Sequence, residues 1–152
     1  MTHDELVASY GDKYGLADFR LIDGLARLDM GEGIDVYVES REDSLLLHTG
    51  VGVEKNPDPR LLRHMLGANL FFAGKNHAAL AMDPGTGDVL LLLGVDSGNL
   101  DVYHFELAVA ELVAEAGYWR EFLSRGKTAL DELALGDVPA APVARPIPGM
   151  MA

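Results

Sequence analysis

The sequence predicts an α+β fold in which three helices pack on an antiparallel, strongly twisted sheet, and the chain is expected to form a homodimer. Two observations predict this fold class. Apolar residues recur with a helical period in three segments, and with a period of two in the segments between them. The expected order is helix, three strands, helix, two strands, helix, and the short connections between strands favour antiparallel pairing.

A capping box marks the start of the first helix. Thr2 and Glu5 have the T-x-x-E spacing, in which each side chain bonds the backbone amide of the other residue. Leu6, Tyr10 and Tyr14 then recur every fourth residue, which predicts one apolar stripe on a helix that ends near residue 15.

The segment from residue 18 to residue 54 alternates apolar and polar side chains with the period of a strand. Phe19 and Leu21 begin the alternation, and the Asp23-Gly24 dipeptide after them favours a tight hairpin. Longer strands are expected at residues 26–30, 34–39 and 45–53. Because one side of these strands is apolar and the other polar, we expect an antiparallel sheet that is covered on one face.

The second helix, expected at residues 59–73, is apolar over an unusually wide surface. Asp58 is a suitable N-cap, and Pro59 suits the first helical position. Two apolar stripes lie side by side along it, the first formed by Leu61, Met65, Ala68 and Phe72 and the second by Leu62, Leu66 and Leu70. The sheet can cover one side of such a helix, and we expect a second subunit to cover the other.

Two strands and a long helix complete the folded part. The strands are expected at residues 78–82 and 88–95, joined by a turn at Pro84-Gly85-Thr86-Gly87. The second strand is apolar on both faces, which suits a strand that is covered on both sides or lies at a subunit contact. The helix, residues 102–125, carries a continuous apolar seam formed by Val102, Phe105, Val109, Leu112, Ala116, Trp119 and Leu123.

We expect the chain to divide into one α+β domain, residues 1–126, and a flexible tail, residues 127–152. The tail is rich in proline and alanine. This composition favours extended or polyproline conformations, with at most one helical turn around Leu130 to Leu135.

Acidic charge and apolar character occur together in this chain. It carries a net charge of −12 at pH 7 with an isoelectric point near 4.6, yet its mean hydropathy is +0.10. The negative charge argues against binding to nucleic acid and to anionic membrane surfaces. The sequence has no cysteine, and its N-terminus lacks the basic and apolar run of a signal peptide, so we expect a cytoplasmic protein without disulfides.

No pattern of residues indicates an enzyme, a metal centre or a cofactor site. Gly126-Lys127-Thr128 resembles the end of a phosphate loop, but the position five residues before that glycine is Glu121, inside an expected helix. The five histidines and the adjacent acidic pairs lack the spacing of metal ligands or of a catalytic carboxylate pair. An enzyme that uses scattered carboxylates or histidines is the least supported alternative.

One stretch of the second helix, Leu66-Gly-Ala-Asn-Leu-Phe-Phe72, resembles the A-N-L-x-F segment of class I type III secretion chaperones, the Tir chaperone-like family. The elements after it are also similar to that family: a short strand, a glycine-containing hairpin, the strand Val89-Leu-Leu-Leu-Leu93 and a long helix ending near Trp119. The first helix, followed by Gly15-Leu16, fits the same pattern, so the resemblance covers residues 4–125.

The resemblance implies a small bacterial homodimer in the cytoplasm that binds the non-globular N-terminal segment of a secreted effector and keeps it soluble and export-competent. The secretion ATPase is a further candidate partner, and no cofactor or enzymatic activity is implied. The alternative is a dimeric protein-binding or regulatory module of the same fold without a secretion role.

An extended partner segment gains affinity from backbone pairing at an exposed strand edge and specificity from pockets for its side chains. The candidate effector-binding residues lie in an apolar groove expected between the first helix and the strands that follow: Leu6, Tyr10, Phe19, Leu21 and Leu28. For each of them, a place in the core is the competing interpretation.

The candidates for the dimer interface lie on the second helix: Leu62, Met65, Leu66, Asn69 and Phe72. Such an interface would bury about 800 Å² per subunit. Asn69 either forms a hydrogen bond across the dimer or caps a group within its own subunit, and both interpretations stay open at this point.

Overall fold

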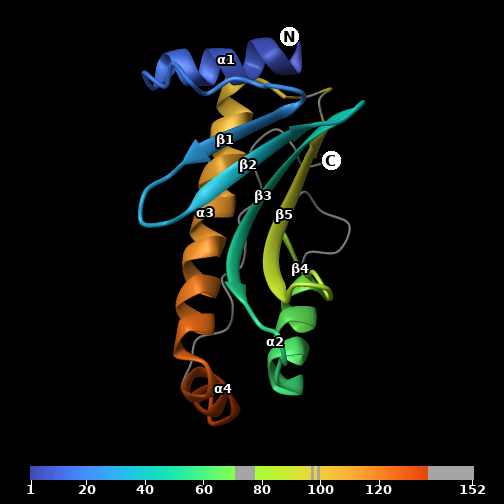
Figure 1. The fold of residues 1–152 in the computed structure, drawn as a ribbon, viewed down its shortest axis with the longest axis vertical. Helices are drawn as coiled ribbons and strands as arrows, with labels where there is room; N and C mark the ends of the chain where they lie inside the picture. The colour runs from blue at the N-terminus through green and yellow to red at the C-terminus, as the bar shows by residue number, and fades with distance from the viewer. Residues whose placement is uncertain (71–77, 97, 99, 137–152) are drawn as a thin grey trace.

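The computed structural model describes residues 1–70, 78–96, 98 and 100–136 of the chain. In these residues, four helices pack on one antiparallel sheet with the strand order β1-β2-β3-β5-β4 (Figure 1). The elements are α1 (His3–Lys13), β1 (Leu25–Asp29), β2 (Asp35–Ser40), β3 (Ser44–Val53), α2 (Pro59–Leu70), β4 (Ala79–Met82), β5 (Asp88–Asp96), α3 (Val102–Arg125) and α4 (Lys127–Ala134). The predicted fold class and the order of the first eight elements are confirmed, and α4 is an addition.

The capping box forms as predicted. The Glu5 backbone N–H donates to the Thr2 hydroxyl at 3.1 Å, and the Thr2 N–H donates to the Glu5 carboxylate at 2.7 Å. After α1 the chain turns back closely, and the Leu16 N–H donates to the Gly11 carbonyl at 2.7 Å. A Cβ atom at Gly11 would lie 2.9 Å from the Leu16 carbonyl oxygen, so only glycine allows this approach.

The Asp23-Gly24 dipeptide makes the predicted hairpin. Ile22 and Leu25 exchange two backbone hydrogen bonds across it, and both central residues have positive φ angles of 52° and 79°. However, Phe19 and Leu21 form no strand. The Phe19 ring instead enters an aromatic cluster, 5.6 Å from the Tyr10 ring, which takes its backbone away from the sheet.

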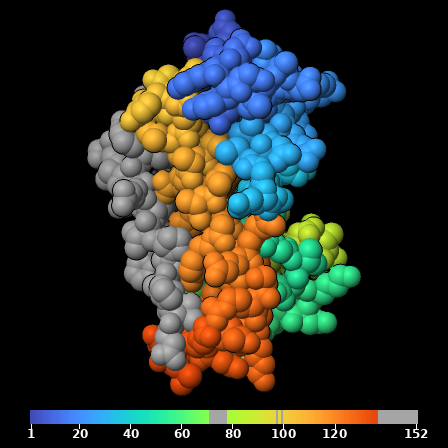
Figure 2. Space-filling view, turned by 90° about the vertical axis from the view of Figure 1, so that its left-hand side faces the viewer, coloured from blue at the N-terminus to red at the C-terminus, as the bar shows by residue number. Residues whose placement is uncertain are grey.

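The core lies between α3 and one face of the sheet, here called the inner face. Alternate residues of β1, β2, β3 and β5 are buried on this face. Helix α3 packs across β3 and β5, and its predicted seam is confirmed, with Phe105, Leu112, Ala116 and Trp119 fully buried. Figure 2 shows α3 running the length of the molecule, from α1 at one end to α4 at the other.

The opposite, outer face of the sheet is half-exposed. The residues of each strand that alternate with the buried ones lie on this face. Residues that are paired across neighbouring strands form rows that run across the sheet. Tyr37 of β2 lies opposite His48 of β3, which in turn lies opposite Leu92 of β5. Leu90 and Leu92 are the apolar residues of β5 on the outer face, and because of them the sequence of this strand is apolar on both faces. Each is only partly buried within the chain.

Helix α4 differs from the sequence prediction. Residues 127–134 form a helix of eight residues, where a flexible segment with at most one helical turn was expected. Ala129 and Leu130 are buried, and Leu133 packs against the core at the next position on the same helical face. These apolar contacts outweigh the composition of the tail as a whole, whose later residues, 137–152, lie outside the described part.

Two further findings concern the described residues alone. None of their helices combines the length and the apolar composition that a crossing of a lipid bilayer requires. No group of three histidine, aspartate or glutamate side chains among them could hold a metal ion.

Candidate functional site

Four of the five candidate effector-binding residues are enclosed within the single chain. Leu6, Tyr10, Phe19 and Leu28 are buried, and Leu21 packs against them while partly exposed. The Tyr10 ring lies edge-on to the Phe105 ring of α3 at 5.1 Å, so the groove expected between α1 and the strands is filled by the chain's own side chains. The structure brings these residues together as core.

Polar contacts hold the end of α1 against α3 beside this cluster. The Tyr14 hydroxyl donates to the Glu106 carboxylate at 2.6 Å, and the Lys13 ammonium lies 2.6 Å from the same oxygen. The hydrogen bond from Lys13 holds the pKa of the Glu106 carboxyl below its ordinary value. These contacts fix the end of α1 on α3.

Strand β1 is an open edge of the sheet. Among the described strands, none pairs with it on the side away from β2. The Ser40 N–H donates to the Gly24 carbonyl and the Met30 N–H to the Ile34 carbonyl, and bonded pairs alternate along an antiparallel ladder. The backbone N–H and C=O groups of Arg27 and Asp29 therefore point to the free edge.

Exposed apolar side chains lie at the hairpin end of this edge. Ile22 is 70% exposed and Leu25 is 45% exposed, although both belong to the ordered hairpin. Neither was singled out from the sequence. The available signal was the tight turn itself, because the apolar residues that flank a two-residue hairpin at a sheet edge have little of the chain to pack against.

The other edge of the sheet, at β4, is covered in its middle. The Leu80 N–H donates to the Asn69 side-chain oxygen at 2.8 Å, and the Asn69 side-chain amide donates to the Leu80 carbonyl at 2.9 Å. The side chain thus occupies both backbone groups that a further strand would use at this position. Of the two interpretations of Asn69, the bond within the subunit is the one observed.

The second apolar stripe of α2 is exposed. Leu66 is 68% exposed and Leu70 is 72% exposed, with Leu62 on the same side of the helix. Met65 faces the other way and is buried in the core. Phe72, the remaining dimer candidate, lies outside the described residues. An exposed leucine stripe of this kind is typical of a helix that contacts a partner.

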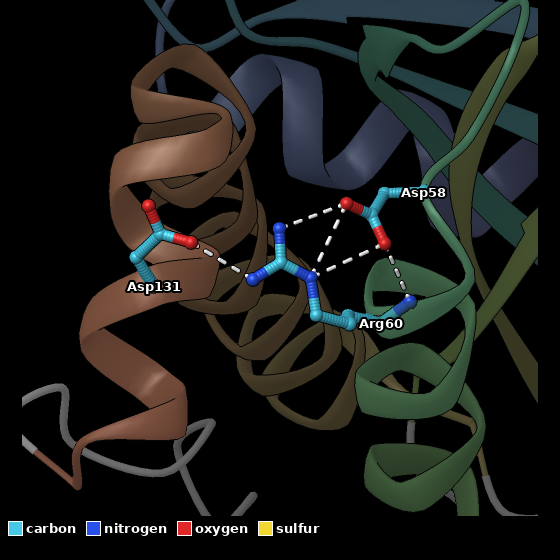
Figure 3. A network of polar contacts seen from close by, with 3 residues as sticks. All are labelled: Asp58, Arg60 and Asp131. Carbon is cyan, nitrogen blue, oxygen red and sulfur yellow. Dashed lines mark hydrogen bonds and ion pairs between the residues drawn. The ribbon is translucent and has the colours of Figure 1, made fainter.

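An arginine links the start of α2 to α4 (Figure 3). The Arg60 guanidinium donates to Asp58 at 2.9 Å and to Asp131 of α4 at 2.8 Å. The Asp58 carboxylate also accepts the Arg60 backbone N–H, as an N-cap does, and these hydrogen bonds hold the pKa of its carboxyl below the ordinary value. A cavity of about 190 Å³ lies between these elements and the end of α3, lined by both apolar and charged residues.

One carboxylate is buried on α3. Glu115 is 4% exposed, and one of its oxygens has no hydrogen-bond partner among the described residues. Burial raises the pKa of Glu115 to about 7, the negative charge of Glu111 adds to the rise, and the Trp119 indole N–H acts against it. A buried carboxylate with an unpartnered oxygen lowers the stability of the fold when it carries its charge.

Comparisons with known proteins agree with this fold. A chain in the structure of the ExsC–ExsE complex has 22% sequence identity and a TM-score of 0.68, with 78% of this chain and 90% of that chain covered. A chain in the structure of the Yersinia pestis type III secretion chaperone SycH with a stable fragment of YscM2 has 18% identity and a TM-score of 0.65, with coverage of 78% and 99%. A chain of the heterodimeric ExoU–SpcU complex from the type III secretion system of Pseudomonas aeruginosa has 25% identity and a TM-score of 0.53, with coverage of 86% and 98%.

A comparison with curated protein sequences gave no match. The model of the Tir chaperone protein (CesT) family, in contrast, matches residues 5–120. This match spans every described element from α1 to most of α3, and it confirms the resemblance to class I type III secretion chaperones. The chain belongs to the Tir chaperone protein (CesT) family.

Proposed function

We propose that this chain is a type III secretion chaperone that binds an extended, non-globular N-terminal segment of a secreted effector in the bacterial cytoplasm and keeps it competent for export. The observation that carries the proposal is the open edge of β1 in a member of this chaperone family. The edge offers the backbone groups of Arg27 and Asp29, with exposed apolar side chains beside them.

An added strand is the simplest occupant of this edge. Backbone hydrogen bonds along β1 give affinity that does not depend on the partner's sequence, which suits a partner without a fold of its own. Ile22 and Leu25 supply apolar contacts at the end of the strand. Of the five residues first proposed from the sequence, four belong to the core behind this surface and Leu21 packs against that core.

The chaperone is proposed to act as a homodimer through α2. The exposed stripe of Leu62, Leu66 and Leu70 lies on the side of α2 that does not face the core. This modifies the interface proposed from the sequence, since Met65 is buried and Asn69 is bonded to β4. The secretion ATPase remains a candidate partner, to which no described surface is assigned.

The experiment that tests the proposal separates backbone pairing from side-chain effects. The Arg27→Pro variant lacks the backbone N–H of residue 27, which points to the free edge of β1. The hydrogen bonds between β1 and β2 are therefore kept, whereas a strand added at the free edge loses one hydrogen bond. We expect the variant to fold, by circular dichroism, and to capture far less effector when co-expressed with the exported proteins of its host. The Arg27→Ala variant, which loses the same side chain but keeps the N–H, serves as the matched control and should bind as the unmodified chain does.

Equal capture by the Arg27→Pro and Arg27→Ala variants would contradict pairing along β1. Recovery of proteins that are never exported, from cells with an active secretion system, would favour the alternative of a regulatory module with the same fold.

A further inference from the structure

The outer face of the sheet has an open depression next to the Asp23–Gly24 hairpin. Its volume is about 560 Å³, and it is lined by Asp23, Gly24, Leu25, Tyr37, Glu39, Ser40 and His48. Leu25 lies opposite Glu39 and Tyr37 opposite His48 in the strand register, so the lining comes from two adjacent rows of β1, β2 and β3.

We propose that this depression is a subsite for a lysine or arginine side chain of the segment that pairs along β1. The inference rests on the proposed function and adds to it the chemistry of one residue of the partner.

The charge of the lining favours a cation. Asp23 and Glu39 are its two acidic residues. Glu39 has two positive or ionisable neighbours, the Arg41 guanidinium at 3.5 Å and the His48 ring nitrogen at 3.9 Å. The longer of these contacts exceeds hydrogen-bond distance and the shorter lies at its upper limit, so the carboxylate can accept a stronger bond from an incoming cation.

The aromatic part of the lining favours the same ligand. The rings of Tyr37 and His48 are stacked at 5.4 Å with an angle of 17° between their planes. Burial lowers the pKa of His48 below its ordinary value, so the imidazole is neutral at pH 7 and does not repel a cation. An aromatic surface beside a carboxylate binds guanidinium and ammonium groups by a cation–π interaction and by an ion pair together.

The chain's own arginine on β1 leaves the depression free. Arg27 lies in the same row as Tyr37, but its guanidinium donates two hydrogen bonds of 3.0 Å to Asp35, which belongs to the row farther from the hairpin. A strand paired along β1 would place a residue beside Arg27 on the outer face. Glu39 lies on β2, two strand spacings or about 9.6 Å from the added strand, so only a long side chain that crosses over β1 can meet the Glu39 carboxylate.

The test uses probes that do not require the effector to be known. N-acetyl-argininamide is titrated into the isotope-labelled protein at pH 7.5, and N-acetyl-citrullinamide, its neutral analogue of nearly the same shape, is titrated in parallel. We expect saturable shifts of the backbone amide signals of Leu25, Tyr37 and His48 with the arginine probe, and binding about three- to fivefold weaker with the citrulline probe.

Substitutions then test whether the arginine probe binds in the depression. Glu39→Gln and Tyr37→Ala should each weaken binding of the arginine probe, whereas Glu121→Gln, which removes an exposed carboxylate of α3, should not. Equal shifts with both probes would overturn the proposal. So would unchanged binding by Glu39→Gln, or shifts spread without saturation over the whole acidic surface.

The two proposals fail in distinguishable ways. If the arginine probe binds as expected but no exported protein is captured on co-expression, the proposed function fails while the cation site stands. If an effector is captured and Glu39→Gln and Tyr37→Ala hold it as firmly as the unmodified chain does, the subsite fails while the chaperone function stands.

Discussion

Glu115 shows how one residue can make the stability of this fold depend on pH. Its folded pKa of about 7 lies above the ordinary value of 4.5 because burial disfavours the charged form. The folded chain therefore holds the proton up to a higher pH than the unfolded chain does. As pH rises from about 4.5 to about 7, the contribution of this group becomes increasingly unfavourable to folding, and above that range it is constant.

Replacing Glu115 with glutamine should accordingly stabilise the protein at alkaline pH. Glutamine keeps the size of the side chain and removes the charge, so we expect Glu115→Gln to raise the free energy of unfolding by about 1–3 kcal/mol at pH 8 and by much less at pH 5. Urea unfolding at the two pH values measures the difference. Glu121→Gln on the exposed side of α3 is the control, and a gain of the same size at both pH values would contradict the electrostatic explanation.

At the scale of elements, α4 is held by a few apolar contacts together with ion pairs at its surface. Leu130 is buried, whereas Leu135, just after the helix, is 76% exposed. Asp131 and Glu132 pair with Arg60 and Arg125, but such exposed pairs contribute only about 0–1 kcal/mol each. The burial of Leu130 is therefore the main attachment of α4 to the domain.

Leu130→Ala should loosen α4 and destabilise the domain by about 2–3 kcal/mol, because it removes buried methyl groups and leaves a cavity. Leu135→Ala, which changes the same atoms at an exposed position, should change stability by less than about 0.5 kcal/mol. Thermal unfolding and hydrogen exchange of the α4 amides measure both effects. Equal stability of the two variants would mean that α4 is not part of the folded unit, and that the domain ends at residue 126 as predicted from the sequence.

The elements that could be predicted from sequence are those whose signals are local. The capping box, the Asp23-Gly24 turn and the seam of α3 each lie within one segment, and each is confirmed. The prolines that begin at Pro139 outweighed the helical signal of Leu130 and Leu133 in the prediction for this segment. Phe19 and Leu21 were expected to begin the alternation of the sheet but form no strand, because the Phe19 ring packs against Tyr10 of α1 and Phe105 of α3.

The candidate site depended more strongly on such distant contacts. An apolar pattern shows that Leu6 and Tyr10 are buried, but it does not show whether a partner or the chain's own α3 buries them. The bond between Asn69 and Leu80 joins α2 to β4, and nothing in the sequence near Asn69 specifies it. The exposed leucine stripe of α2, in contrast, could be read directly from its spacing.

At the scale of the whole molecule, the −12 net charge and the exposed leucines of α2 act together. The charge opposes non-specific association, and the leucine stripe is the surface that we propose for a specific contact between two subunits. We expect light scattering to give a mass of about twice 16.4 kDa for the unmodified chain.

A charge placed in the stripe should abolish the dimer. Leu66→Glu should give the monomer mass because an unpaired carboxylate would be buried at the contact. Leu135→Glu introduces the same charge at another exposed leucine and should leave the dimer intact. A chain that stayed dimeric with Leu66→Glu would show that the subunits meet at a different surface.

The Asn69 side chain also limits how many sheets can join. A sheet with two open edges can accept a neighbour on both sides and so can grow into a fibril, whereas a sheet with one open edge can only terminate a stack. Because Asn69 blocks the middle of the short β4 edge, a second copy that paired at β1 would leave no fully open edge among the described strands. The fold can therefore keep a receptive edge at β1 with a lower tendency to polymerise edge to edge.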